Sequence, residues 1–124
     1  MTNARQKKKI LIIDDDETIA IILKEFLVNK NYSAAFVTQV TDVDLLIAKE
    51  KPNLIFLDYR MSPMTGKDIL EKVSLRNRDL PVVMMSAYRT REGEFEVKNL
   101  GAVEYISKPF DFVQLENLLV RLLG

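Results

Sequence analysis

The sequence predicts an α/β domain in which five parallel strands form one doubly wound sheet with helices on both faces. Five short apolar runs alternate with five longer segments of helical periodicity, as in successive β-α units. The apolar runs are almost entirely apolar rather than alternating with polar residues, which is typical of strands buried on both faces. A length of 124 residues suits a single domain. Right-handed crossovers then give three layers.

The first two β-α pairs occupy the N-terminal part of the chain. The aliphatic run Ile10–Ile13 is the first expected strand, and Ile19–Val28 has the apolar spacing of an amphipathic helix. Ala34–Val37 is a weaker strand candidate because it contains two alanines. The segment Val43–Ala48 then predicts a short second helix.

The third and fourth pairs follow the same pattern. Leu54–Leu57 is an apolar run that predicts a buried strand, and Lys67–Arg76 predicts the third helix. Val82–Met85 follows Pro81, a residue that commonly precedes a strand, and is the fourth expected strand. The fourth helix is expected over Thr90–Leu100.

The fifth pair completes the expected domain. Val103–Ile106 predicts the last strand, and Phe112–Leu123 predicts the last helix. The fourth helix is the weakest of the five because Gly93 costs about 1 kcal/mol relative to alanine inside a helix.

Composition limits the chemistry that this chain can perform. It contains no cysteine and no histidine, which excludes disulfides, thiolate nucleophiles and imidazole ligands or bases. The formal net charge is 0, with 18 basic and 18 acidic residues, so we expect no general attraction to nucleic acid or to a membrane. No apolar run has the length of a membrane span, and we expect a cytoplasmic protein.

Charged and hydroxyl side chains follow the expected strands at the ends where functional groups gather in such a sheet. Three adjacent carboxylates, Asp14 to Asp16, follow the first strand, and Asp58 follows the third. Ser86 follows the fourth strand and Lys108 the fifth. Carboxylates without imidazole form an all-oxygen site, which suits Mg²⁺. A lysine and a hydroxyl suit a phosphate, and a remaining carboxylate can act as a nucleophile.

Each of these residues also has an ordinary structural role. Asp15 or Asp16 would cap the first helix, and Asp58 would begin a turn. Ser86 would cap the fourth helix, and Lys108 would be a solvated surface residue. The joint placement of all these groups at the ends of separate strands favours a functional site over chance.

Four sequence features together resemble response-regulator receiver domains, and the resemblance extends from Lys9 to Leu123. They are the acidic pair Asp14-Asp15, the segment Leu57-Asp58-Tyr59-Arg60-Met61 with Gly66 eight residues after the aspartate, Ser86-Ala87, and Lys108-Pro109-Phe110. The chain is most similar to single-domain receivers of the sporulation-phosphorelay and chemotaxis types. The resemblance implies a (βα)5 flavodoxin-like fold with strand order 2-1-3-4-5. We expect a receiver domain over residues 9–124 after a basic tail of residues 1–8.

The resemblance implies a phosphoacceptor site that uses Mg²⁺. Asp58 would accept the phosphoryl group. Asp14 and Asp15 would bind Mg²⁺, Asp15 more directly, together with Asp58 and the backbone carbonyl of Arg60.

The resemblance also implies roles for residues near the fourth and fifth strands. Lys108 would pair with the phosphoryl oxygens, and Ser86 would form a hydrogen bond to one of them. Tyr105 matches the aromatic switch position of the family. The peptide bond between Lys108 and Pro109 is expected to be cis, and Gly66 is expected to open the third helix.

Three departures from the family pattern are visible. The segment Met61-Ser-Pro-Met-Thr-Gly66 has its proline one place late and threonine in place of an aspartate, which affects the expected path of this loop. Ser86 replaces a commoner threonine. Arg60 and Tyr88 occupy positions that border the attacking water in the family. Both are large, and we expect them to shield an aspartyl phosphate from hydrolysis.

The implied function is that of a signalling module rather than a metabolic enzyme. A phosphohistidine on a histidine kinase or a histidine phosphotransfer protein would donate to Asp58, since this chain has no histidine. The domain would catalyse only its own phosphorylation and dephosphorylation. It would be a monomer or a weak phosphorylation-dependent dimer. The chain is expected to be either a stand-alone receiver or part of a longer regulator.

Two alternative functions remain at the level of sequence. Asp14-Asp-Asp16-Glu-Thr18 fits the Asp-x-Asp-x-Thr opening of haloacid-dehalogenase-like phosphohydrolases, with Asp14 as nucleophile and Asp16 as general acid and base. That assignment leaves Asp58 without a role. The second alternative is a receiver-like interaction domain that is not phosphorylated.

A partner-docking surface is expected on the first helix. On a helical wheel, Ile19, Ile22, Leu23, Phe26 and Leu27 share one arc, which we expect to face the core. Ile21 lies roughly opposite that arc, beside the small residue Ala20. Ala20 and Ile21 are therefore expected to contact a helical phosphotransfer or kinase domain.

Overall fold

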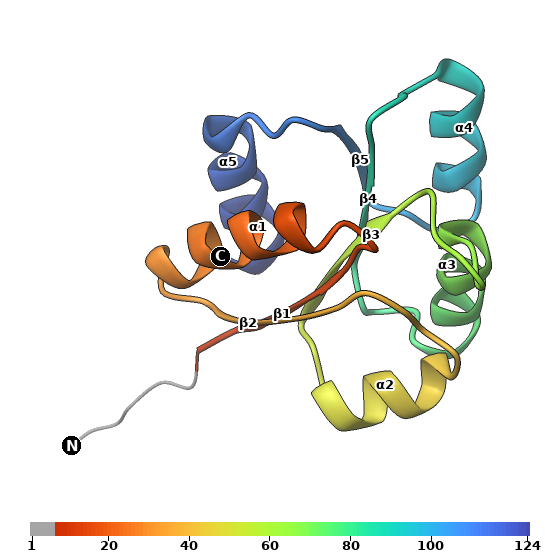
Figure 1. The fold of residues 1–124 in the computed structure, drawn as a ribbon, viewed down its shortest axis with the longest axis horizontal. Coiled ribbons are helices and arrows are strands. Elements are labelled where there is room, and N and C mark those ends of the chain that lie inside the picture. The colour runs from red at the N-terminus through yellow and green to blue at the C-terminus, as the bar shows by residue number, and fades with distance from the viewer. Residues whose placement is uncertain (1–6) are drawn as a thin grey trace.

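A computed structural model describes residues 7–124, so Arg5 and most of the expected basic tail lie outside the described residues. The five strands form one parallel sheet in the order β2-β1-β3-β4-β5, which confirms the expected order (Figure 1). The strands are β1 (Lys9–Ile13), β2 (Ser33–Val37), β3 (Leu54–Asp58), β4 (Val82–Ser86) and β5 (Glu104–Ser107).

Five helices cover the two faces of this sheet (Figure 1). They are α1 (Glu17–Asn29), α2 (Val43–Glu50), α3 (Gly66–Arg76), α4 (Arg91–Asn99) and α5 (Phe112–Leu123). Helices α1 and α5 pack on one face, and α2, α3 and α4 pack on the other. This is the doubly wound α/β architecture that the sequence predicts.

Each face of the sheet contributes its own hydrophobic core. Along β1, Leu11 and Ile13 point toward α2 and α3, whereas Ile10 and Ile12 point toward α1 and α5. All four are buried because side chains alternate between the faces of a strand that is covered on both sides. This two-sided burial explains why the strand residues are apolar without alternation.

The helix boundaries follow from capping side chains. Asp16 caps α1, since its Oδ1 accepts a hydrogen bond of 3.2 Å from the backbone N–H of Ile19. Ser86 does not cap α4, because it belongs to β4; Thr90 has that role and accepts a 3.0 Å hydrogen bond from the N–H of Gly93. The fifth strand begins one residue later than expected.

The expected core-facing arc of α1 is correct for Leu23 and Leu27 but wrong for Ile22. Ala20 is completely buried, with 0% exposure, together with Leu23 and Leu27. Ile22, expected in the core, is 45% exposed. The small side chain of Ala20 allows the helix to approach the sheet closely, so the buried face centres on Ala20 and Leu23. Ala20 therefore cannot contact a partner, whereas Ile21 remains 39% exposed.

Among the residues that the structure describes, no helix is long and apolar enough to cross a membrane.

Candidate functional site

The sheet brings the predicted site residues together at the carboxyl ends of four aligned strands. Backbone hydrogen bonds continue the ladder beyond the strands, from the N–H of Asp14 to the carbonyl of Val37 and from the N–H of Lys108 to the carbonyl of Ser86. Asp58 is the last residue of β3 and lies in register with Met85. The positions of these side chains are therefore fixed by the sheet.

Asp14 and Asp58 are buried around a single lysine. Asp14 has 0% exposure and Asp58 has 6%. The Nζ atom of Lys108 lies 2.6 Å from Oδ2 of Asp14 and 3.2 Å from Oδ1 of Asp58. Oδ1 of Asp14 accepts a 2.9 Å hydrogen bond from the N–H of Asp16. Lys108 is thus an internal ion-pair partner and not the solvated surface residue of the ordinary interpretation.

The electrostatics of the site favour a positive charge between these groups. Burial, together with the nearby negative charge of Asp14, raises the pKa of Asp58 to about 6, although Lys108 opposes the shift. Burial lowers the pKa of Lys108, but the carboxylates of Asp14 and Asp58 act in the opposite direction, and the net pKa is raised. The site therefore holds its lysine charged while making the charged form of Asp58 costly.

The three carboxylates satisfy the requirements for a divalent cation. Asp14, Asp15 and Asp58 each present an oxygen within 4.8 Å of the others. One lysine balances only part of their charge, and Oδ2 of Asp14 has no hydrogen bond of good geometry among the described residues. An all-oxygen cluster of this kind suits Mg²⁺, which prefers carboxylates and retains several waters.

The loop between β3 and α3 lies next to this cluster. A Cβ atom added to Gly66 would lie 2.2 Å from the carbonyl oxygen of Asp58, so only glycine permits this approach. Thr65 and Asp68 form a capping box at the start of α3. The threonine that departs from the family pattern therefore caps the helix itself. The preceding bond between Ser62 and Pro63 is cis, which the sequence did not predict.

Comparison with known proteins identifies the family. A family model for the response regulator receiver domain matches residues 10–120. The chain belongs to this family. Sporulation initiation phosphotransferase F of Bacillus subtilis (strain 168) is 33% identical over 119 residues, which cover 94% of each chain. Transcriptional regulatory protein ZraR of Salmonella typhimurium (strain LT2) is 30% identical over 120 residues, which are 97% of this chain and 27% of that protein.

Solved structures agree with this assignment. The signal receiver domain of a DNA-binding response regulator from Colwellia psychrerythraea 34H has a TM-score of 0.87 with 28% identity. The match covers 94% of this chain and 98% of that one. Receiver domains bind Mg²⁺ at an acidic pocket, and the cluster of Asp14, Asp15 and Asp58 is an acidic group that could hold a metal ion.

The two large side chains expected to shield the phosphoryl group, Arg60 and Tyr88, are exposed and contact each other. The guanidinium carbon of Arg60 lies 5.6 Å from the ring centroid of Tyr88, which is within the range of a cation–π contact. Arg60 and Asp15 also line a groove of about 590 Å³ beside the site. The two residues expected to shield the phosphoryl group are thus close enough to act together.

Ser86 and Tyr105 occupy the interior behind the site. Oγ of Ser86 accepts a 3.0 Å hydrogen bond from the N–H of Tyr88, so the hydroxyl fixes the start of the loop 87–90. Tyr105 is only 1% exposed, and its ring lies toward α4. The peptide bond between Lys108 and Pro109 is cis.

Sequence reasoning did not identify two residues that contact these groups. Arg89 lies over the Tyr105 ring at 5.7 Å from its centroid, and Tyr59 packs against the same ring at a centroid distance of 6.2 Å. Tyr59 directly follows Asp58, and Arg89 lies three residues after Ser86. That proximity in sequence was the only available signal, because the contacts depend on the placement of β5 and α4.

Proposed function

We propose that Asp58 of this receiver accepts a phosphoryl group from a phosphohistidine on a histidine kinase or histidine phosphotransfer protein. The signal then leaves by docking or by onward phosphotransfer. The observation that supports this most strongly is the position of Asp58 between Lys108 and the carboxylates of Asp14 and Asp15. Asp58 retains 6% exposure, whereas Asp14 is completely buried.

The reaction is an in-line displacement at phosphorus. A carboxylate oxygen of Asp58 forms a bond to phosphorus as the phosphorus–nitrogen bond breaks, and the electron pair of that bond remains on the histidine nitrogen. Lys108 stabilises the negative charge of the transferred group, since its Nζ lies 3.2 Å from Asp58. Bound Mg²⁺, held by Asp14, Asp15, Asp58 and the carbonyl of Arg60, would neutralise the phosphoryl oxygens. The receiver thereby catalyses its own modification.

The side chains of the phosphohydrolase alternative are committed to other contacts. Asp14 is buried, with one oxygen on the N–H of Asp16 and the other beside Lys108. Asp16 accepts a hydrogen bond as the N-cap of α1. A nucleophile and a general acid need to face the substrate. This arrangement therefore favours Asp58 as the phosphoacceptor.

Incubation with a small acyl phosphate tests the proposal. We expect the protein to incorporate one phosphoryl group in the presence of Mg²⁺ and none in EDTA. Asp58→Asn should abolish incorporation, whereas Glu116→Gln, a change of a surface carboxylate on α5, should not. Incorporation that is equal in wild-type protein and Asp58→Asn would overturn the proposal.

A further inference from the structure

Helix α4 is held in place by few apolar contacts. Its nine residues include only two that are buried, Gly93 and Val97. The remaining contacts of this helix with its surroundings are mainly polar, through Glu94, Glu96 and Lys98. An element with so little buried apolar surface depends on these polar contacts for its position.

Two side chains pack against the Tyr105 ring. The guanidinium carbon of Arg89 lies 5.7 Å from the ring centroid, and the Tyr59 ring lies at a centroid distance of 6.2 Å. Gly93 lies against the end of the ring, since a Cβ atom added there would be in ordinary van der Waals contact with the Tyr105 hydroxyl oxygen, at 3.5 Å. Tyr105 is therefore enclosed by residues from three parts of the fold: the segment after β3, the loop 87–90 and α4.

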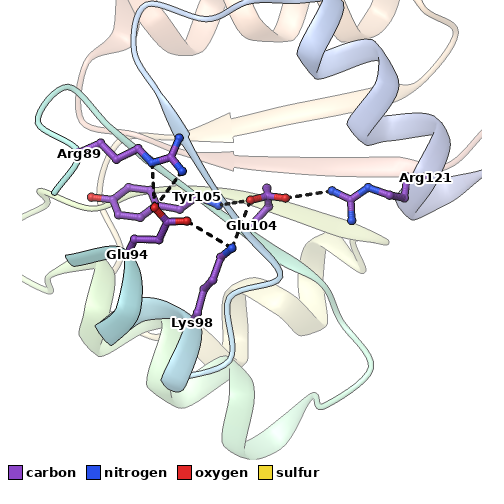
Figure 2. Close-up of polar contacts among 6 residues, drawn as sticks. All are labelled: Arg89, Glu94, Lys98, Glu104, Tyr105 and Arg121. Atoms are coloured by element: carbon purple, nitrogen blue, oxygen red, sulfur yellow. Dashed lines mark hydrogen bonds and ion pairs between the residues drawn. The ribbon is translucent and has the colours of Figure 1, made fainter. Parts of the chain in front are cut away.

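Both side chains that enclose Tyr105 are bound by carboxylates of α4. Oε1 of Glu94 accepts hydrogen bonds from Nε and Nη2 of Arg89, at 3.2 and 2.9 Å. Figure 2 shows this pair beside the Tyr105 ring. Two residues further along, Oε1 of Glu96 accepts a hydrogen bond of 3.4 Å from the hydroxyl of Tyr59. Helix α4 thus positions both side chains that pack against Tyr105.

Further ion pairs connect Glu94 across the surface to α5. Nζ of Lys98 lies 3.3 Å from Oε2 of Glu94 and 3.6 Å from Oε1 of Glu104, and Arg121 contacts Glu104 at 3.0 Å (Figure 2). Lys98 therefore belongs to the ion-pair network but is not one of the side chains that enclose Tyr105. It provides a matched control for Arg89, because both donate to Glu94.

We propose that Arg89 and Glu94 form an ion-pair latch that keeps Tyr105 buried and couples the loop 87–90 to α4. Arg89 lies in the loop that Ser86 fixes through the N–H of Tyr88, so a displacement of Ser86 changes the position of Arg89 relative to Glu94. The coupling of the latch to phosphorylation rests on the proposed function of Asp58. The latch itself is a property of the unphosphorylated receiver and can be tested without it.

Exposure of Tyr105 to solvent is the direct measure of the latch. The receiver is labelled with 3-fluorotyrosine, and the Tyr105 signal is assigned by its loss in Tyr105→Phe. A soluble paramagnetic probe then reports how often the ring is exposed. Partly exposed ion pairs contribute about 0.2–1 kcal/mol, so Arg89→Gln and Glu94→Gln should each increase the exposed population about 1.4- to fivefold. Lys98→Gln should leave it unchanged.

Salt provides a second readout. Raising NaCl from about 0.1 to about 1 M shortens the screening length from about 10 to about 3 Å, so Tyr105 exposure should rise in wild-type protein and change less in Arg89→Gln. Equal exposure in wild-type protein, Arg89→Gln and Glu94→Gln would overturn the latch, as would an equal increase in Lys98→Gln. Parallel phosphorylation by an acyl phosphate separates the two proposals. If Asp58 is not phosphorylated, the proposed function is wrong, but the exposure data still show whether Arg89 and Glu94 keep Tyr105 buried.

Discussion

At the scale of single residues, the charged form of Asp58 is electrostatically unfavourable in the folded protein. Its carboxylate is buried beside Asp14, and these two causes raise its pKa to about 6 against the opposing effect of Lys108. The folded protein therefore holds a proton on Asp58 in a pH range where the unfolded chain, with a pKa near 3.8, has released it. Stability is gained below that range and lost as the pH rises through about 6.

We expect Asp58→Asn to stabilise the metal-free protein at pH 7. Asparagine removes the buried charge, and the expected gain in unfolding free energy is about 1–3 kcal/mol. Below about pH 3 the aspartate is protonated in both states, so the gain should disappear. Urea unfolding in EDTA at several pH values measures this difference. A gain that is the same at pH 4 and pH 7 would show that charge is not its cause.

The residues Arg60 and Tyr88 are expected to control the lifetime of the phosphoryl group. The two side chains are exposed and contact each other, and we expect the pair to hinder water that attacks in line with Asp58. Arg60→Asn and Tyr88→Glu should each accelerate decay by about two- to tenfold, as the loss of one hydrogen bond or of steric cover would. Loss of label after removal of the donor measures the decay, with Arg78→Asn as a control for the lost charge. Unchanged or slower decay in both variants would contradict shielding.

At the scale of elements, α1 exposes apolar side chains that we expect to contact a docking partner. Ile21 is 39% exposed and Ala20 is buried, so the patch consists of Ile21 and its exposed neighbour Ile22. We expect Ile21→Glu to slow phosphotransfer from a phosphohistidine protein at least about tenfold, since loss of an apolar anchor typically costs more than 1 kcal/mol. Phosphorylation by an acyl phosphate should be unaffected. Leu75→Glu, a change of an exposed leucine on α3, is the matched control. Equal losses with both donors would indicate misfolding.

The start of α3 depends on the absence of a side chain at Gly66. Alanine is favoured over glycine in a helix by up to about 1 kcal/mol, so propensity alone predicts that Gly66→Ala is stabilising. The clash with the Asp58 carbonyl at 2.2 Å predicts the opposite, a loss of about 1–3 kcal/mol and slower phosphorylation, because the loop must move. Thermal unfolding decides between the two signs. A raised melting temperature would contradict the close approach.

Periodicity predicted the type and order of all ten elements, because each strand contains a short apolar run and each helix has an amphipathic pattern. It did not predict the rotation of α1. The helical wheel assigned Ile22 to the core because of its hydrophobicity, but the packing distance between helix and sheet favours Ala20. Intrinsic hydrophobicity cannot distinguish a small residue at the contact from a large one beside it.

At the scale of the whole molecule, the strand ends explain why the acidic cluster could be expected from sequence. Parallel strands place their carboxyl ends at one edge, so Asp14, Asp58 and Lys108 were predicted to meet, and they do. The contacts of Arg89 with Glu94 and with the Tyr105 ring could not be predicted. They depend on where α4 packs, which no pattern within α4 determines.

Mapping the residue that carries the phosphoryl group tests most directly whether Asp58 is the phosphoacceptor. The receiver is phosphorylated with a small acyl phosphate in the presence of Mg²⁺. The aspartyl phosphate formed on the protein is trapped by borohydride reduction, and the modified peptide is located by mass spectrometry. We predict modification at Asp58 alone, within the peptide that contains Tyr59. Modification at Asp14 would contradict the account, because it would make the buried partner of Lys108 the nucleophile and leave Asp58 without a role.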